Sequence, residues 1–189
     1  MSDLADRERE KYERVWTFPS YRRVSPGEQE VGKAFYVMEC AKLGRSLIDY
    51  GAGPGRATYH FQTMGLDVLA VDHAANALET EVPFRQACLW DMPGDLGPSD
   101  FAFCCDVMEH IPPEKVDAVL AGIAARTKVA AFFRIALHPD AMGARTIGEP
   151  LHLTVQPAEW WLERLLAAAE WAVTPLESPS NYALFICTF

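Results

Sequence analysis

Residues 47–55 (LIDYGAGPG) constrain the fold more than any other part of the chain. They read as an apolar strand that breaks into three glycines at every second position, Gly51, Gly53 and Gly55. In an open parallel sheet, ligands bind beyond the carboxyl ends of the strands, where glycine allows close approach to the backbone. A dinucleotide fingerprint needs a glycine at position 56, where this chain has Arg56. The loop therefore disfavours a pyrophosphate cradle and a nicotinamide oxidoreductase, and favours a smaller ligand with a charged amino-acid tail.

A second strand, residues 65–72, ends in Asp72, where a carboxylate can accept hydrogen bonds from both hydroxyls of a ribose. The order strand, D-x-G-x-G-x-G, helix, strand, acid resembles the class I S-adenosylmethionine-dependent methyltransferases, from about residue 45 to the end. The alternative is a nucleotide-type fold with another ligand or none. The resemblance implies S-adenosyl-L-methionine as cofactor, with the ribose at Asp72 and the methionine moiety at the loop residues Asp49, Gly51, Ala52, Gly53 and Gly55.

Short apolar runs alternate with helical stretches along the chain, which predicts a single α/β domain. We expect a Rossmann-like, mostly parallel sheet of seven strands with helices on both faces, and an antiparallel last strand that pairs with the sixth. The strands are predicted at 46–50, 66–71, 83–87, 101–105, 129–136, 171–175 and 182–189. Helices are predicted near 55–64, 74–80, 112–126 and 157–169, and Trp160 or Trp161 is expected in the core.

Residues 1–45 precede the cofactor-binding core, 46–189, and are predicted to form a helical arm and lid. Ser25 as a cap, Pro26 in the first turn and Glu28 three residues after the cap predict a helix over 26–42. The preceding stretch is aromatic and charged. It either covers core or closes over the ligand cleft, in which case Trp16 and Tyr21 line the acceptor pocket.

Residues 84–93 (FRQACLWDMP) are similar to the segment that contacts adenine in the same family. The family often has an acid where this chain has Cys88. The resemblance therefore implies that adenine is bound through groups around Leu89 and Trp90, with His73 next to the ribose acid; Trp90 could equally be ordinary core or surface cover.

Residues 100–113 resemble the fourth-strand motif D-V-L-E-H of this family. The resemblance places Cys105 and Asp106 beside the sulfonium and His110 near the acceptor. A histidine can act there as a general base because its pKa is normally near neutrality. The alternative is that His110 only packs against adenine and the loop.

Two further candidates follow the fifth strand. His152 precedes the last predicted helix, where the family commonly has a histidine, and faces either the acceptor pocket as a second catalytic residue or solvent. Arg134 interrupts an apolar strand near its functional end. It either binds an acidic acceptor in the pocket or pairs with a nearby carboxylate.

A metal site is the less favoured hypothesis for these residues. Asp106, Glu109 and His110 stand at i, i+3 and i+4, so one helical turn would bring them to one face, and His152 could join them. Some methyltransferases with a similar E-x-x-E-H motif bind a metal that orients the acceptor oxygen. Here an aspartate replaces the first glutamate and two prolines follow at once. We therefore favour no metal, with Asp106 capping the turn, Glu109 solvated or bonded to backbone, and His110 alone in the pocket.

The composition favours a small-molecule acceptor with an oxygen or nitrogen nucleophile. The net charge is −9, divided into +1 over residues 1–45 and −10 over the remainder, which disfavours binding to nucleic acid. Five cysteines without C-x-x-C spacing, no signal peptide and no membrane-spanning run indicate a cytoplasmic protein with reduced thiols. The alternatives are a methyltransferase acting on nucleic acid or protein, and a non-catalytic cofactor-binding subunit. The sequence defines no oligomeric state.

Overall fold

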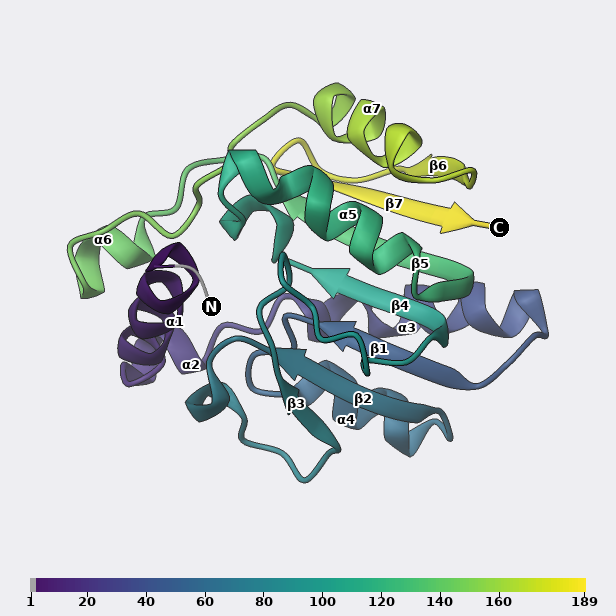
Figure 1. The fold of residues 1–189 in the computed structure, drawn as a ribbon, viewed down its shortest axis with the longest axis horizontal. Coiled ribbons are helices and arrows are strands. Elements are labelled where there is room, and N and C mark those ends of the chain that lie inside the picture. Colours follow the sequence, from purple (N-terminus) through teal and green to yellow (C-terminus); the bar gives the residue numbers. More distant parts are fainter. Residues whose placement is uncertain (1–2) are drawn as a thin grey trace.

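The computed structural model describes residues 3–189, which form one seven-stranded sheet with helices on both faces (Figure 1). The sheet order is β3-β2-β1-β4-β5-β7-β6, and all pairs are parallel except those of β7, which runs antiparallel to β5 and β6. This confirms the predicted architecture. The strands are β1 (Ser46–Tyr50), β2 (Asp67–Asp72), β3 (Phe84–Gln86), β4 (Ser99–Cys105), β5 (Thr127–Ala136), β6 (Ala172–Leu176) and β7 (Tyr182–Thr188).

Each face of the sheet has its own core. Helices α3 (Gly27–Ala41) and α4 (Arg56–Thr63) pack on one face, and α5 (Val116–Ala124) and α7 (Ala158–Ala168) on the other. Strand β4 shows why: Phe101 and Phe103 lie in the α3/α4 core, whereas Ala102 and Cys104 lie in the α5/α7 core. Successive side chains of a strand point to opposite faces, so a strand covered on both sides is apolar throughout. Trp161, on α7, is fully buried, as expected.

One predicted helix is wrong and another begins late. Residues 74–80 form only the 3₁₀ turn η1 (Ala75–Ala77), because the following chain is tied to the glycine loop by the bond from Glu79 N to Pro54 O (3.0 Å). The helix predicted from residue 112 starts as a 3₁₀ turn, η3 (Pro113–Lys115), since Pro112 is extended, and becomes α5 at Val116. Ser25 does not cap α3; Pro26 holds the cap position without a side-chain bond.

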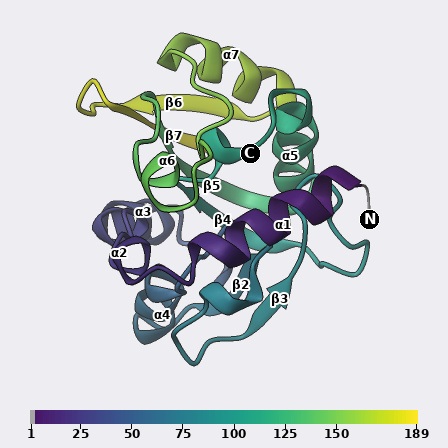
Figure 2. The same cartoon turned by 90° about the vertical axis from the view of Figure 1, so that its left-hand side faces the viewer.

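The N-terminal arm crosses the carboxyl ends of the strands (Figure 2). It consists of α1 (Asp3–Val15) and the short α2 (Pro19–Arg22), and α6 (Met142–Thr146) lies beside it. Val15 and Trp16 are buried against Ala74, Ala77 and Leu151, so apolar packing holds the arm to loops that follow both β2 and β5.

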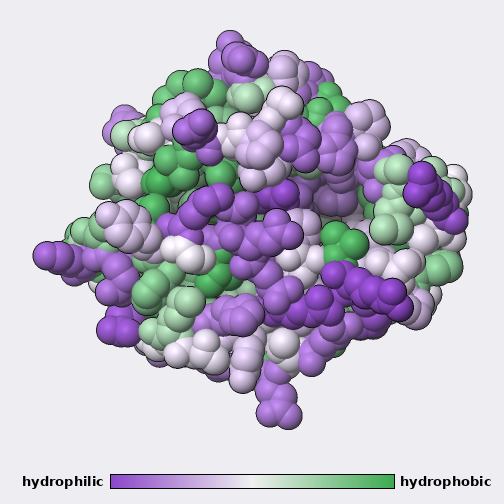
Figure 3. All heavy atoms as spheres, turned by 180° about the vertical axis from the view of Figure 1, so that it is seen from behind, coloured by the Kyte–Doolittle hydropathy of each residue, from purple (hydrophilic) through white to green (hydrophobic). Residues whose placement is uncertain are grey.

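Figure 3 shows that the face behind the view of Figure 1 is predominantly polar, with hydrophobic residues in smaller patches. Within residues 3–189, no helix combines the length and apolar character needed to cross a membrane. All five cysteines are free, and four of them are buried; Cys104 and Cys105 point into different cores.

Candidate cofactor and acceptor site

The glycine loop after β1 adopts a backbone that side chains would not tolerate. Gly51 has a φ of 76°, and a Cβ there would lie 2.3 Å from the Val107 side chain. Gly53 has a φ of 53°, and a Cβ there would contact the Trp16 ring at 3.1 Å. Glycine at these positions keeps the backbone accessible beneath the arm.

Two carboxylates flank this loop, one buried and one partly buried. Asp49, at the end of β1, is 3% exposed and accepts a hydrogen bond from Thr58 Oγ1 (2.6 Å), and burial raises its pKa to about 7. Asp72, at the end of β2, accepts backbone bonds from Gly53 and Ala74 (2.8 Å each), one on each carboxylate oxygen; its pKa is raised, again by burial. Each oxygen of Asp72 keeps a further lone pair for a ligand donor.

Two cavities meet over the loop. The smaller, about 100 Å³, is lined by Asp72, His73, Leu89 and Trp90, and by Glu8 and Tyr12 of α1. The larger, about 170 Å³, lies between Asp49, Ser25 and Pro26 on one side and Asp140, Met142 and His152 on the other. Five residues line both cavities, so the two form one elongated site: Trp16, Tyr21, Gly51, Asp106 and His110.

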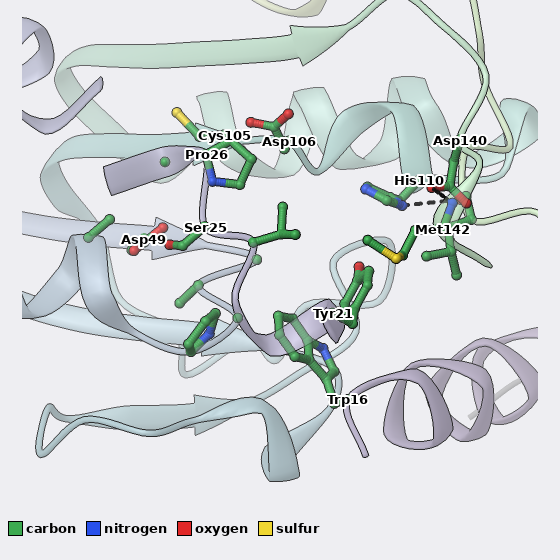
Figure 4. Close-up of a pocket in the computed structure, with 18 of the residues that line it drawn as sticks. Trp16, Tyr21, Ser25, Pro26, Asp49, Cys105, Asp106, His110, Asp140 and Met142 are labelled. Atoms are coloured by element: carbon green, nitrogen blue, oxygen red, sulfur yellow. Dashed lines mark hydrogen bonds between the residues drawn. The ribbon is translucent and has the colours of Figure 1, made fainter. Parts of the chain in front are cut away.

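Figure 4 shows how the elements contribute to the larger cavity. Asp49 and Cys105 stand at strand ends on one side, and Trp16 and Tyr21 of the arm lie across from them. The two arm rings pack edge to face with centroids 4.6 Å apart. The arm therefore forms a wall of the site, and the assignment of Trp16 and Tyr21 to the acceptor pocket stays a prediction.

The smaller cavity contains polar atoms without protein partners. His73 Nε2 and Trp90 Nε1 are buried and make no hydrogen bond, although both residues line this cavity. Burial lowers the pKa of His73 to about 4, so its ring is neutral near pH 7. Buried polar atoms normally find a partner, and a bound ligand can supply one here.

Asp106, which lines both cavities, forms an ion pair with Arg134, which lines neither. Arg134 also lies 3.6 Å from the buried Glu30 and over the ring of Tyr182 at 4.2 Å. Arg134 was expected either to bind an acidic acceptor in the pocket or to pair with a nearby carboxylate. It lines neither cavity, and it pairs with the carboxylate of Asp106. Asp106 does not cap the following 3₁₀ turn, η2 (Met108–His110), because its carboxylate is held by Arg134.

His110 lies where the two cavities meet and is held by two partners. Its Nδ1 is 2.8 Å from the Tyr12 hydroxyl and 3.1 Å from the Leu151 carbonyl oxygen. Burial lowers the pKa of His110 to about 3, so the ring is neutral. His152 packs edge to face against it, with centroids 4.7 Å apart, and its own Nδ1 lies 2.6 Å from the carbonyl oxygen of His138. His152 therefore lies beside His110 at the larger cavity, and the catalytic role of both residues stays a prediction.

Glu109, His110 and His152 each offer a ligand atom, and these atoms lie within 4.8 Å of one another. The other member of the hypothetical metal set, Asp106, is paired with Arg134. Glu109 is fully buried: Oε1 accepts the backbone N–H of Ala136 (3.1 Å), whereas Oε2 has no partner. The donor set thus has three members in place of the four predicted, and Glu109 is bonded to backbone through Oε1, one of the two placements expected for it.

Several lining residues were not recognised as site residues from the sequence. Ser25 and Pro26 have the pattern of helix signals, and Asp140 and Met142 fall in a stretch without a predicted element. Tyr12 belongs to the aromatic stretch of the arm, where no motif distinguishes it. No local pattern marks these positions, because the contacts that place them in the site come from residues far away in the chain.

No family model and no curated protein sequence matches this chain. Solved structures do resemble it. A complex of DhpI with SAM and HEP has a TM-score of 0.68 and 19% identity, with 99% of each chain covered. Magnesium protoporphyrin IX methyltransferase from Synechocystis with bound SAH has a TM-score of 0.66 and 16% identity, over 95% of this chain and 92% of that one. The methyltransferase domain of a bacterial Hen1 protein has a TM-score of 0.66 and 15% identity, over 86% of this chain and 98% of that one. The chain therefore has the fold of these methyltransferases.

Proposed function

We propose that this protein transfers a methyl group from S-adenosyl-L-methionine to an oxygen or nitrogen atom of a small molecule. The observation that carries the proposal is the elongated site, in which a cavity beside Asp72 and a cavity beside Asp49 share Gly51 and His110. Its length and polarity suit a ligand with a nucleoside at one end and an amino acid at the other.

Each half of the cofactor has residues that fit it. Asp72 would accept hydrogen bonds from the ribose hydroxyls, and Leu89, Trp90 and His73 would surround the adenine, where two nitrogens lack partners. Asp49 and the loop would hold the amino-acid end, where an ammonium group would favour the ionised carboxylate. Cys105 and Asp106 would lie beside the sulfonium, which supplies the activated methyl group.

The protein's own task is to align the acceptor, exclude water and remove a proton where needed. We assign the role of base to His110, which is neutral and lies at the junction of the cavities, with His152 beside it. Its low pKa makes it a weak base, which suits an acceptor whose proton becomes acidic only as the methyl group is transferred.

The charge of the site supports an uncharged or cationic acceptor. The residues that line the two cavities include Asp49, Asp72, Asp106 and Asp140 but neither lysine nor arginine. An anionic acceptor would therefore have to shed its hydration without a positive partner. The excess of acidic residues after position 45 also disfavours a nucleic-acid substrate. The free thiols support the proposal of a cytoplasmic location.

The proposal is tested by calorimetry with S-adenosylhomocysteine and, as control, NAD. We expect micromolar binding of the first and none of the second; tight NAD binding without S-adenosylhomocysteine binding would refute the assignment. An acceptor panel of phenols, alcohols, amines, carboxylic acids, phosphate esters and short RNA, with detection of S-adenosylhomocysteine release, then tests the acceptor class. Turnover confined to RNA or to the acids would contradict it.

A further inference from the structure

Tyr12 connects the N-terminal arm to the histidine at the junction of the cavities. It lies on α1, and its hydroxyl is 2.8 Å from His110 Nδ1 and 3.4 Å from the carbonyl oxygen of Leu151. The two rings meet edge to face, with centroids 5.8 Å apart. Three segments widely separated in the chain, α1, the turn after β4 and the loop after α6, therefore converge on one imidazole nitrogen.

These contacts determine which nitrogen of His110 carries the proton. The Leu151 carbonyl can only accept a hydrogen bond, and it lies 3.1 Å from Nδ1. If Nδ1 carried no proton, its lone pair would face a lone pair of the carbonyl oxygen at that distance, which is repulsive. The neutral ring therefore carries its proton on Nδ1. The Tyr12 oxygen accepts from Nδ1–H, and the hydroxyl donates on to the carbonyl. Nε2 is then the atom with a free lone pair, and hence the proton acceptor.

We propose that Tyr12 is a positioning residue that makes His110 competent only when the arm is closed over the site. The proposal rests on the proposed function, in which His110 is the base. Docking of α1 supplies the hydroxyl that orients the ring, whereas the Leu151 carbonyl fixes the Nδ1–H tautomer. With the arm displaced, Nδ1 keeps only the carbonyl, and the ring loses its edge-to-face contact with Tyr12.

Helix α1 also lines the cofactor side of the site, so the position of this one helix determines both the closure of the site and the orientation of His110. Glu8 and Tyr12 line the smaller cavity, and Trp16 lies over Gly53. A ligand that fills this cavity holds α1 in place, and α1 holds His110. The hydroxyl stays protonated, because burial raises the pKa of Tyr12 well above its ordinary value. Proton removal is thereby restricted to the state in which water is excluded from the cofactor.

The test is ¹⁵N NMR of histidine-labelled protein, ligand-free and with S-adenosylhomocysteine, for wild type, Tyr12→Phe and the control Tyr59→Phe, whose ring is exposed on α4. Phenylalanine keeps the ring that lines the cavity and removes only the hydroxyl. All three proteins should show His110 protonated at Nδ1 and bare at Nε2, because the Leu151 carbonyl is retained. In Tyr12→Phe alone the His110 ring signals should be shifted and broadened, because the hydroxyl no longer holds the ring in one orientation. His110 signals in Tyr12→Phe that match those of wild type and the control would overturn the proposal.

Two further measurements separate positioning from a structural role. With an accepted substrate, Tyr12→Phe should lower kcat about tenfold, a part of what a general base contributes, and leave the KM for S-adenosylmethionine within about threefold. Amide exchange in α1 should be faster in Tyr12→Phe and in His110→Phe, because each removes the same bond. A raised KM with unchanged kcat would contradict the proposal. Failure of the proposed function would appear separately, as absence of S-adenosylhomocysteine binding by wild type.

Discussion

Replacing Asp49 with asparagine should stabilise the ligand-free protein above neutral pH. The carboxyl is 3% exposed, and burial raises its pKa from 3.8 to about 7. Because the folded state then binds the proton more tightly than the unfolded state, Asp49 favours folding below pH 3.8, and this contribution is lost as the pH rises through 7. An amide keeps the volume and can still accept the bond from Thr58, but it has no charge to bury.

The size of the effect follows from the pKa shift. Each pH unit between the unfolded and folded pKa values changes the free energy of unfolding by about 1.4 kcal/mol, so a shift of roughly three units gives about 4 kcal/mol. Relative to wild type, the variant should therefore gain roughly 2–4 kcal/mol between pH 4 and pH 8.5. Most of the gain should fall between pH 4 and 7.

Urea unfolding followed by tryptophan fluorescence at a series of pH values measures this difference. Other titrating groups are common to both proteins, so the difference in unfolding free energy isolates Asp49. The control is Asp67→Asn, which makes the same substitution at an exposed aspartate at the opposite end of β2. A loss of stability in Asp49→Asn that is the same at pH 4 and pH 8.5 would refute the reasoning. It would show that the ionised carboxylate is itself favourable in the folded protein.

Four other expectations are open to direct measurement. Asp72→Ala should weaken S-adenosylhomocysteine binding by roughly 1–3 kcal/mol in calorimetry, with Asp67→Ala unchanged; equal affinities would remove Asp72 from the site. Gel shifts with duplex DNA at physiological salt should show no complex, and tight, steeply salt-dependent binding would contradict this. Methyl-transfer activity should persist in the presence of a chelator. If chelation abolishes the activity, and magnesium or manganese restores it in wild type but not in Glu109→Ala, a metal site is established. Burial lowers the pKa of His110 from 6.5 to about 3, so between these pH values the histidine is protonated in the unfolded state and neutral in the folded state. The free energy of unfolding should therefore decrease as the pH is lowered from 6.5 to about 3. In urea unfolding, His110→Gln should show a weaker dependence on pH in this range.

The sequence predicted the sheet and the loop because their signals are local. An apolar strand followed by glycines needs only neighbouring residues to be recognised, and Gly51 and Gly53 do adopt positive φ angles. Strand β4 likewise shows continuous apolar character because both of its faces are covered. Two long helices, α3 and α7, were predicted close to their observed bounds, since each has a sustained apolar repeat and a clear first turn.

The rest of the site depends on long-range contacts that leave no local pattern. Arg134 pairs with Asp106 across neighbouring strands, 28 positions apart, and this pair removes Asp106 from the proposed cluster. Tyr12 and His110 are 98 positions apart. The helix predicted at 74–80 failed for the same reason, because bonds to the glycine loop and to the arm compete with the helical pattern.

The arm is translated before the segments that it packs against. Asn76 bonds to the Glu13 carbonyl, and Arg14 bonds to the Ile147 carbonyl, so the arm is attached to both halves of the sheet. Until residue 151 has left the ribosome, Val15 and Trp16 have no complete pocket to enter. The arm therefore lacks its full pocket while residues 17–151 are translated, and it can complete its packing only after them.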